Sequence, residues 1–128
     1  MNDQSFKDRI WREKFRDALI GLKLGVRGQS SFFVHVFSAA TVIVVATILA
    51  VSLIEWCLLL LCIAGVLTAE MLNSAMESMA KAITDQHDPH LRIALDVGSA
   101  AVLLASAGAA VVGTIIFANH LGILVGWW

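Results

Sequence analysis

Three long apolar segments dominate this sequence and limit the folds that the chain can adopt. They cover residues 32–54, 56–83 and 93–118, and each exceeds the roughly 20 residues that a helix needs to cross a bilayer. Hydrophobic residues form 59% of the chain and charged residues 15%, whereas soluble domains carry about 50% and about 25%. This composition excludes an ordinary soluble protein. We therefore expect a single all-α membrane domain over residues 1–128 with three transmembrane helices.

The segment before the first span, residues 5–28, mixes charged residues with apolar residues at helical spacing. The apolar positions are Trp11, Phe15, Ala18 or Leu19, Leu22 and Val26. Such a pattern is typical of an amphipathic helix that lies at the membrane surface. The sequence therefore predicts an N-terminal surface helix in front of the three spans.

The nine Lys and Arg residues are distributed unevenly, and their distribution predicts the orientation of the chain. Seven lie between positions 7 and 27, and the other two, Lys81 and Arg92, lie between the second and third spans. Because positively charged loops stay on the cytoplasmic side, we expect the N-terminus and the second loop in the cytoplasm and the C-terminus outside. Neither the net charge of −1 nor this distribution points to a nucleic-acid partner.

Carboxylates inside the second span are the strongest functional signal, because ionisable groups within a membrane are costly. Glu70, Asn73 and Glu77 are spaced i, i+3 and i+7, which places them on one face of a helix. Asp96 stands at the start of the third span and is expected near the same face. These oxygens suit a hard cation such as Mg²⁺. Hydrogen bonding between helices is the alternative, but it does not require two acids on one face.

The sequence AEMLNSAME at residues 69–77, followed by DVGSAAVLLA at residues 96–105, resembles the small bacterial integral-membrane lipid kinases of the diacylglycerol kinase and undecaprenol kinase family. The resemblance extends from about residue 15 to about residue 113. It implies a homotrimeric helical bundle in the bacterial inner membrane, with composite active sites at the cytoplasmic interface. It also implies transfer of the γ-phosphoryl group of Mg·ATP to a lipid hydroxyl.

The resemblance assigns roles to four of these residues. Glu70 is similar to the general base of the family, and Glu77 to its metal-binding acid. Asn73 resembles the family residue that contacts both the base and the phosphates. Asp96 resembles the aspartate of the family's nucleotide site. The role of His35 stays open: the undecaprenol kinase branch has histidine there, but a structural role is equally compatible with the sequence.

Three positions depart from the family pattern. Gln29 stands where the family has an acidic metal ligand, so it retains a carbonyl oxygen without the charge. Leu95 replaces a lysine that contacts phosphate. Lys81 occupies a position that is commonly acidic, four residues after Glu77 and on the same helical face. We therefore hypothesise that Lys81 supplies the missing cation to the nucleotide phosphates.

The sequence favours an ATP-dependent lipid kinase acting on diacylglycerol or undecaprenol. It contains no G-x-x-x-x-G-K-[ST] loop, so side chains of several helices, and of several protomers, must build the ATP site. The alternative is a non-catalytic assembly or regulatory homologue that keeps the fold. A pump or channel is disfavoured, because the outer halves of the spans are apolar. The choice of lipid stays open, since features of both branches are present.

Overall fold

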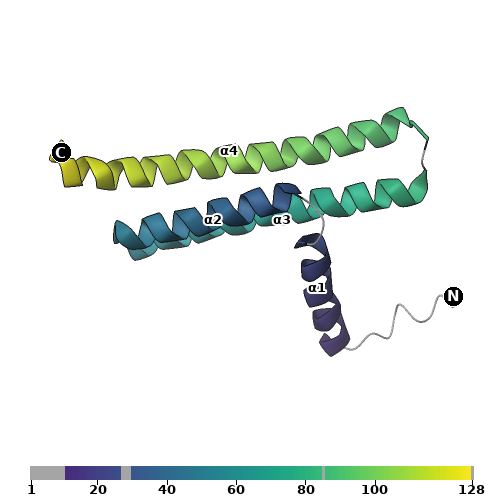
Figure 1. Cartoon of the computed structure of the whole chain (residues 1–128), viewed down its shortest axis with the longest axis horizontal. Coiled ribbons are helices and arrows are strands. Elements are labelled where there is room, and N and C mark those ends of the chain that lie inside the picture. Colours follow the sequence, from purple (N-terminus) through teal and green to yellow (C-terminus); the bar gives the residue numbers. More distant parts are fainter. Residues whose placement is uncertain (1–10, 27–29, 85, 128) are drawn as a thin grey trace.

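The computed structural model describes residues 11–26, 30–84 and 86–127. Within these ranges the regular elements are four α-helices (Figure 1), and no strand is present. They are α1 (Trp11–Val26), α2 (Ser30–Ile48), α3 (Leu53–Ile83) and α4 (Pro89–Val125). The expected surface helix of residues 5–28 therefore corresponds to α1 over its described part, and positions 5–10, 27 and 28 lie outside the described residues.

The core of the fold is a long antiparallel hairpin formed by α3 and α4 (Figure 1). Helix α2 packs along the half of α3 that is closer to its N-terminus, and α1 runs across the direction of the other three helices (Figure 1). The hairpin consequently extends beyond α2 at the end where α3 leads into α4. This arrangement divides the molecule into a three-helix part and a projecting two-helix part.

Local capping decides where the helices begin and end. The first apolar segment, residues 32–54, is divided between α2, which ends at Ile48, and the start of α3. Ser52 caps α3: its hydroxyl accepts from the backbone N–H of Glu55, and the Glu55 carboxylate accepts from the backbone N–H of Ser52 at 2.7 Å. This reciprocal capping box fixes the helix start. Ala50 adopts a positive φ of 50° in the intervening turn.

Helix α4 begins earlier and ends later than the apolar segment 93–118. Asp88 caps it by accepting from the backbone N–H of Leu91 at 2.9 Å, and Pro89 occupies the first turn, where its missing N–H costs nothing. At the other end Gly126 takes the left-handed conformation that stops the helix. Near this end His120 Nε2 lies 3.0 Å from Glu55 Oε2 and ties α4 to the start of α3.

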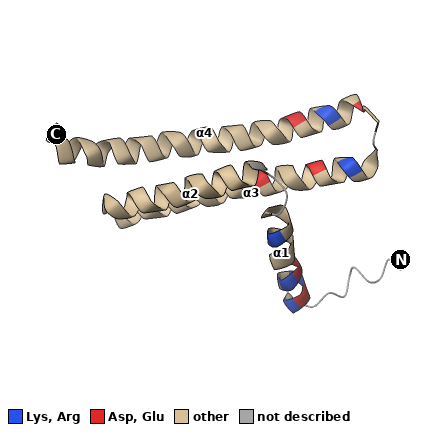
Figure 2. Ribbon diagram, in the orientation of Figure 1, with Lys and Arg blue, Asp and Glu red and all other residues tan. Residues whose placement is uncertain are grey.

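Among the described residues, three helices are long and apolar enough to cross a membrane: α2, α3 and α4. Many of their large apolar side chains point outward, as Leu104 does with 76% of its surface exposed. Such a surface is stable when lipid rather than water surrounds it. Charged residues gather on α1 and at the projecting end of the hairpin (Figure 2). The structure thus has the form of a membrane protein with a polar end.

We expect Ser52→Ala to lower the free energy of unfolding by about 1 kcal/mol, because it removes the capping hydroxyl. The measurement is loss of helical circular dichroism during titration of the protein in mild detergent with sodium dodecyl sulfate. Ser99→Ala is the matched control, since the Ser99 hydroxyl only donates to the Leu95 carbonyl within α4. Equal stability of the two variants would contradict the capping assignment.

Candidate active site

Three polar residues of α3, Glu70, Asn73 and Glu77, share one face of the helix. Glu70 and Asn73 are buried, with 2% and 7% of their surface exposed. Asn73 Nδ2 donates to Glu77 Oε1 at 3.1 Å, which links the last two members of the row. The i, i+3, i+7 spacing therefore places these polar groups along one face of α3, and the hydrogen bond joins Asn73 to Glu77. The chemical roles of these residues remain predictions.

Glu70 lies where three helices converge. His35 on α2 places its Nε2 atom 3.7 Å from Glu70 Oε2, and 19% of the His35 side chain is exposed. Next to Glu70, Met71 meets the end of α1: a Cβ atom added at Gly25 would lie 3.4 Å from Met71 Cε. The second carboxylate oxygen of Glu70, Oε1, is buried and has no hydrogen-bond partner among the described residues. A buried acceptor without a partner is costly, which makes Glu70 a candidate functional group.

The close approach of α3 and α4 at this site depends on Gly98. A Cβ atom at this position would lie 2.6 Å from Asn73 Oδ1 and 3.4 Å from the end of the Met76 side chain. Asn73 Oδ1 is itself buried and lacks a hydrogen-bond partner among the described residues. The small residue therefore lets the hairpin close over the amide.

A polar groove of about 490 Å³ lies at the projecting end of the hairpin. Its walls come from the end of α3, the connecting loop and the start of α4: Ala80, Lys81, Thr84, Gln86, His87, Asp88, Leu91, Arg92, Leu95 and Asp96. Lys81 thus shares one groove with Leu95 and Asp96, although Lys81 belongs to the opposite arm of the hairpin. The Asp96 side chain is 72% exposed, and its Oδ2 lies 3.8 Å from Arg92 Nε.

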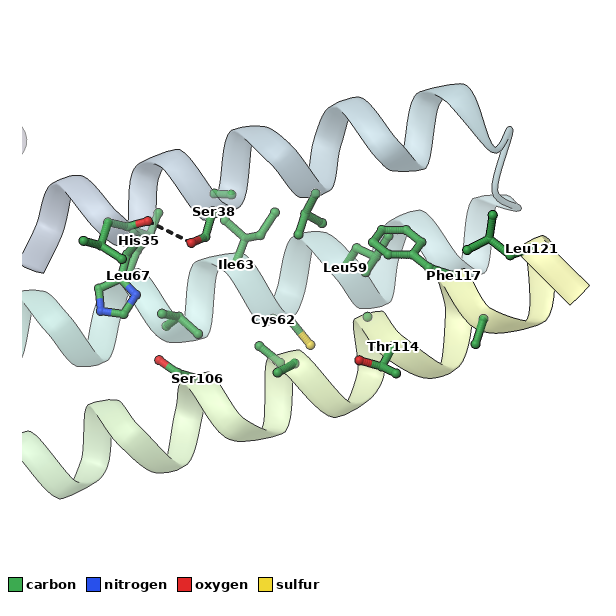
Figure 3. A pocket seen from close by; sticks show the side chains of 18 residues that line it. His35, Ser38, Leu59, Cys62, Ile63, Leu67, Ser106, Thr114, Phe117 and Leu121 are labelled. Carbon is green, nitrogen blue, oxygen red and sulfur yellow. Dashed lines mark hydrogen bonds between the residues drawn. The ribbon is translucent and has the colours of Figure 1, made fainter.

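A second, apolar groove of about 670 Å³ runs between α2, α3 and α4 (Figure 3). His35 and Ser106 stand at one end of it, and Phe117 and Leu121 at the other (Figure 3). The Ser106 hydroxyl oxygen is buried and has no hydrogen-bond partner within the described ranges. The sequence does not predict this groove, because the groove depends on which faces of three helices meet. The third span has no charged residue around Ser106. This stretch agrees with an apolar groove but does not indicate where the groove lies.

Magnesium was expected at Glu77 and Gln29. Gln29 lies outside the described residues. Within residues 11–26, 30–84 and 86–127, no group of three or more His, Cys, Asp or Glu side chains is placed to enclose a metal ion. Magnesium does not need such an enclosure, because it retains water and is commonly held by one or two carboxylates together with substrate phosphates. The oxygens of Glu77 therefore fit a magnesium ion that arrives with a nucleotide.

Taken together, these features define a helical membrane protein with a buried acid between an apolar groove and a polar end. The family model for prokaryotic diacylglycerol kinase matches residues 16–117. Undecaprenol kinase of Bacillus subtilis is 32% identical over 95 residues, which cover 74% of this chain and 77% of that protein. Diacylglycerol kinase of a Synechocystis species is 35% identical over 100 residues, which cover 77% of this chain and 57% of that protein. The chain belongs to the prokaryotic diacylglycerol kinase family, and the resemblance seen at residues 69–77 and 96–105 is confirmed.

We expect Gly98→Ala to lower the free energy of unfolding by about 1–3 kcal/mol, because the added methyl group overpacks the contact with Asn73. Gly108→Ala in the same helix is the control: nothing lies within 4 Å of its added Cβ, so its helix propensity improves without a clash. Denaturation in detergent with sodium dodecyl sulfate measures both. If Gly98→Ala is as stable as Gly108→Ala, the close packing at Asn73 is wrong.

Proposed function

We propose that this protein is an ATP-dependent lipid kinase that transfers the γ-phosphoryl group of Mg·ATP to the hydroxyl of a membrane lipid, diacylglycerol or undecaprenol. The observation that carries the proposal is the position of Glu70. Its carboxylate is buried between the apolar groove and the polar end of the hairpin, and one of its oxygens has no hydrogen-bond partner in the part of the chain that the structure describes. Membership of the family supports the reaction class, and the names of the two relatives supply the candidate lipids.

Glu70 would act as the general base. Phosphoryl transfer requires little covalent chemistry from the protein, but the attacking hydroxyl must be oriented and must lose its proton. The unpartnered Oε1 atom is the acceptor for that proton. A base of this kind must lie within hydrogen-bond reach of the hydroxyl. An alcohol at the end of the apolar groove that His35 and Ser106 line meets this requirement best, because His35 also lies close to Glu70.

The apolar groove would hold the hydrocarbon chain of the lipid. Along α4 its wall extends from Ser106 to Leu121, about 22 Å at roughly 1.5 Å per residue. Apolar side chains form most of this wall, while His35 and the unpartnered Ser106 hydroxyl stand at the end toward Glu70. An amphiphile with one polar end and a long apolar chain matches this distribution of polar groups.

The polar groove at the hairpin end would receive the nucleotide. Lys81, Asp96 and the polar groups of the connecting loop line it, and an ammonium group neutralises phosphate charge during transfer. Glu77, held by the Asn73 amide, would bind the magnesium ion, with Gln29 as a further candidate ligand. Magnesium would supply charge neutralisation on the phosphates. Asn73 would orient Glu77 and contact the phosphates.

A homotrimer would complete these sites. A single chain leaves the polar groove open, since the Asp96 side chain is 72% exposed, and ATP requires more contacts than one hairpin end offers. Helix α1, which carries charged residues and runs across the spans (Figure 2), would lie at the cytoplasmic surface of the inner membrane. The C-terminus would then face outward.

The second candidate is a non-catalytic homologue with the same fold. Leu95 favours it, because this side chain lines the polar groove at the position where the family pattern has a cation. Lys81 in the same groove favours the kinase, since it offers a cation from the other arm of the hairpin.

We expect wild-type protein in mixed micelles to transfer radiolabelled phosphoryl from Mg·ATP to diacylglycerol or to undecaprenol, offered separately. Glu70→Gln is expected to reduce kcat by about 10²–10⁴-fold, because it removes the base and retains the shape. Glu55→Gln, a matched change at the far end of α3, is expected to retain activity. If wild type labels neither lipid, the non-catalytic candidate replaces the kinase; if Glu70→Gln equals wild type, Glu70 is not the base.

We expect Lys81→Met to raise the KM for ATP about 10-fold, which corresponds to loss of one charge-assisted hydrogen bond to phosphate. Adding Leu95→Lys to this variant is expected to restore the KM, because both positions line one groove. Initial rates at varied Mg·ATP and saturating lipid measure both. An unchanged KM in Lys81→Met would show that this lysine does not bind the nucleotide.

A further inference from the structure

His35 forms a connection between the apolar groove and Glu70. Its imidazole lines the inner end of the groove (Figure 3), and its Nε2 atom lies 3.7 Å from Glu70 Oε2. Among the described residues, the other oxygen of the same carboxylate, Oε1, is buried without a hydrogen-bond partner. The two oxygens of Glu70 are therefore in different surroundings, and the His35 imidazole lies on the side of Oε2.

We propose that His35 is the positioning residue of the catalytic base: it holds Glu70 Oε2 and thereby leaves Oε1 directed to the lipid hydroxyl. This inference rests on the proposed kinase function. A buried carboxylate is costly without a partner, and an imidazole N–H that donates to one oxygen lowers that cost while it fixes the rotation of the group. The 3.7 Å separation exceeds a hydrogen bond, and catalytic contacts of this kind shorten when substrate binds.

A second His–Glu pair in the same molecule shows what a structural pair looks like. His120 Nε2 lies 3.0 Å from Glu55 Oε2, and the same oxygen accepts from the backbone N–H of Ser52. That pair caps α3 and joins α4 to it, and neither side chain lines the apolar groove. The pair formed by His35 differs in two ways: its ring lines the groove, and the remaining carboxylate oxygen, Glu70 Oε1, is buried without a hydrogen-bond partner among the described residues. His120 is accordingly the matched control for His35.

The first test compares the kinetics of the two histidines. We expect His35→Leu to reduce kcat about 10–100-fold, with little change in the KM for ATP. Removing the hydrogen-bond partner that orients a metal-binding side chain has an effect of this size. His35→Gln retains an N–H donor and is expected to recover much of the loss, whereas His120→Leu is expected to retain kcat. In a Glu70→Gln background, His35→Leu is expected to cause no further loss, because residues that act as a unit are not additive.

The second test needs no enzymatic activity. The chain contains four histidines, so ¹⁵N labelling of histidine gives few ring signals in detergent micelles. We expect Glu70→Gln to shift the His35 Nε2 signal and to leave the His120 signal unchanged. We expect Glu55→Gln to shift the His120 Nε2 signal and to leave the His35 signal unchanged. An unmoved His35 signal in Glu70→Gln overturns the contact and with it the inference.

The outcomes separate this inference from the proposed function. If wild type is active and His35→Leu keeps the wild-type kcat, or if the loss adds fully to that of Glu70→Gln, the positioning role is wrong while the kinase proposal stands. If wild type phosphorylates neither diacylglycerol nor undecaprenol, the kinase proposal fails and takes the positioning role with it.

Discussion

The main constraint on this structure is the burial of one side chain, that of Glu70, where α1, α2 and α3 meet. Glu70 has 2% of its surface exposed, and burial of a charge without compensation is among the most costly events in folding. Among the described residues this cost is compensated only in part: His35 approaches one oxygen of Glu70, and the other oxygen has no hydrogen-bond partner. The proposed role of Glu70 as a general base would account for this incomplete compensation, because a base needs an oxygen that is available to the hydroxyl group.

The lengths of the helices place this acid between two different environments. Helices α3 and α4 extend beyond α2 (Figure 1), so the apolar groove lies among three helices and the polar groove lies on the projecting hairpin. Glu70 sits on α3 between the stretches that line these grooves. A lipid alcohol and a nucleotide need different surroundings, and the proposed function assigns them to the groove among α2, α3 and α4 and to the groove at the hairpin end. Gly98 keeps the two arms close at this point, because a larger side chain would collide with Asn73.

Helix periodicity predicted the three apolar helices and the row of Glu70, Asn73 and Glu77 along α3, because both are local properties of the chain. The helix ends were less accurate, although the signals were present: Ser52 with Glu55 is a capping box, and Asp88 precedes a proline. The apolar groove and the approach of His35 to Glu70 were not predictable, since they depend on how separate helices rotate against one another. Gln29 lies outside the described residues, so its proposed role rests on the sequence.

The proposed function places Glu70 against the reacting alcohol. An experimental structure of the protein in lipid, with a non-hydrolysable Mg·ATP analogue and a lipid alcohol bound, would measure this directly. We expect the lipid hydroxyl oxygen within hydrogen-bond distance, about 2.6–3.2 Å, of Glu70 Oε1, with the nucleotide phosphates on the side of Asn73 and Glu77. A structure in which Glu70 points to the hydrocarbon chains, or lies remote from the hydroxyl in every subunit, would contradict it.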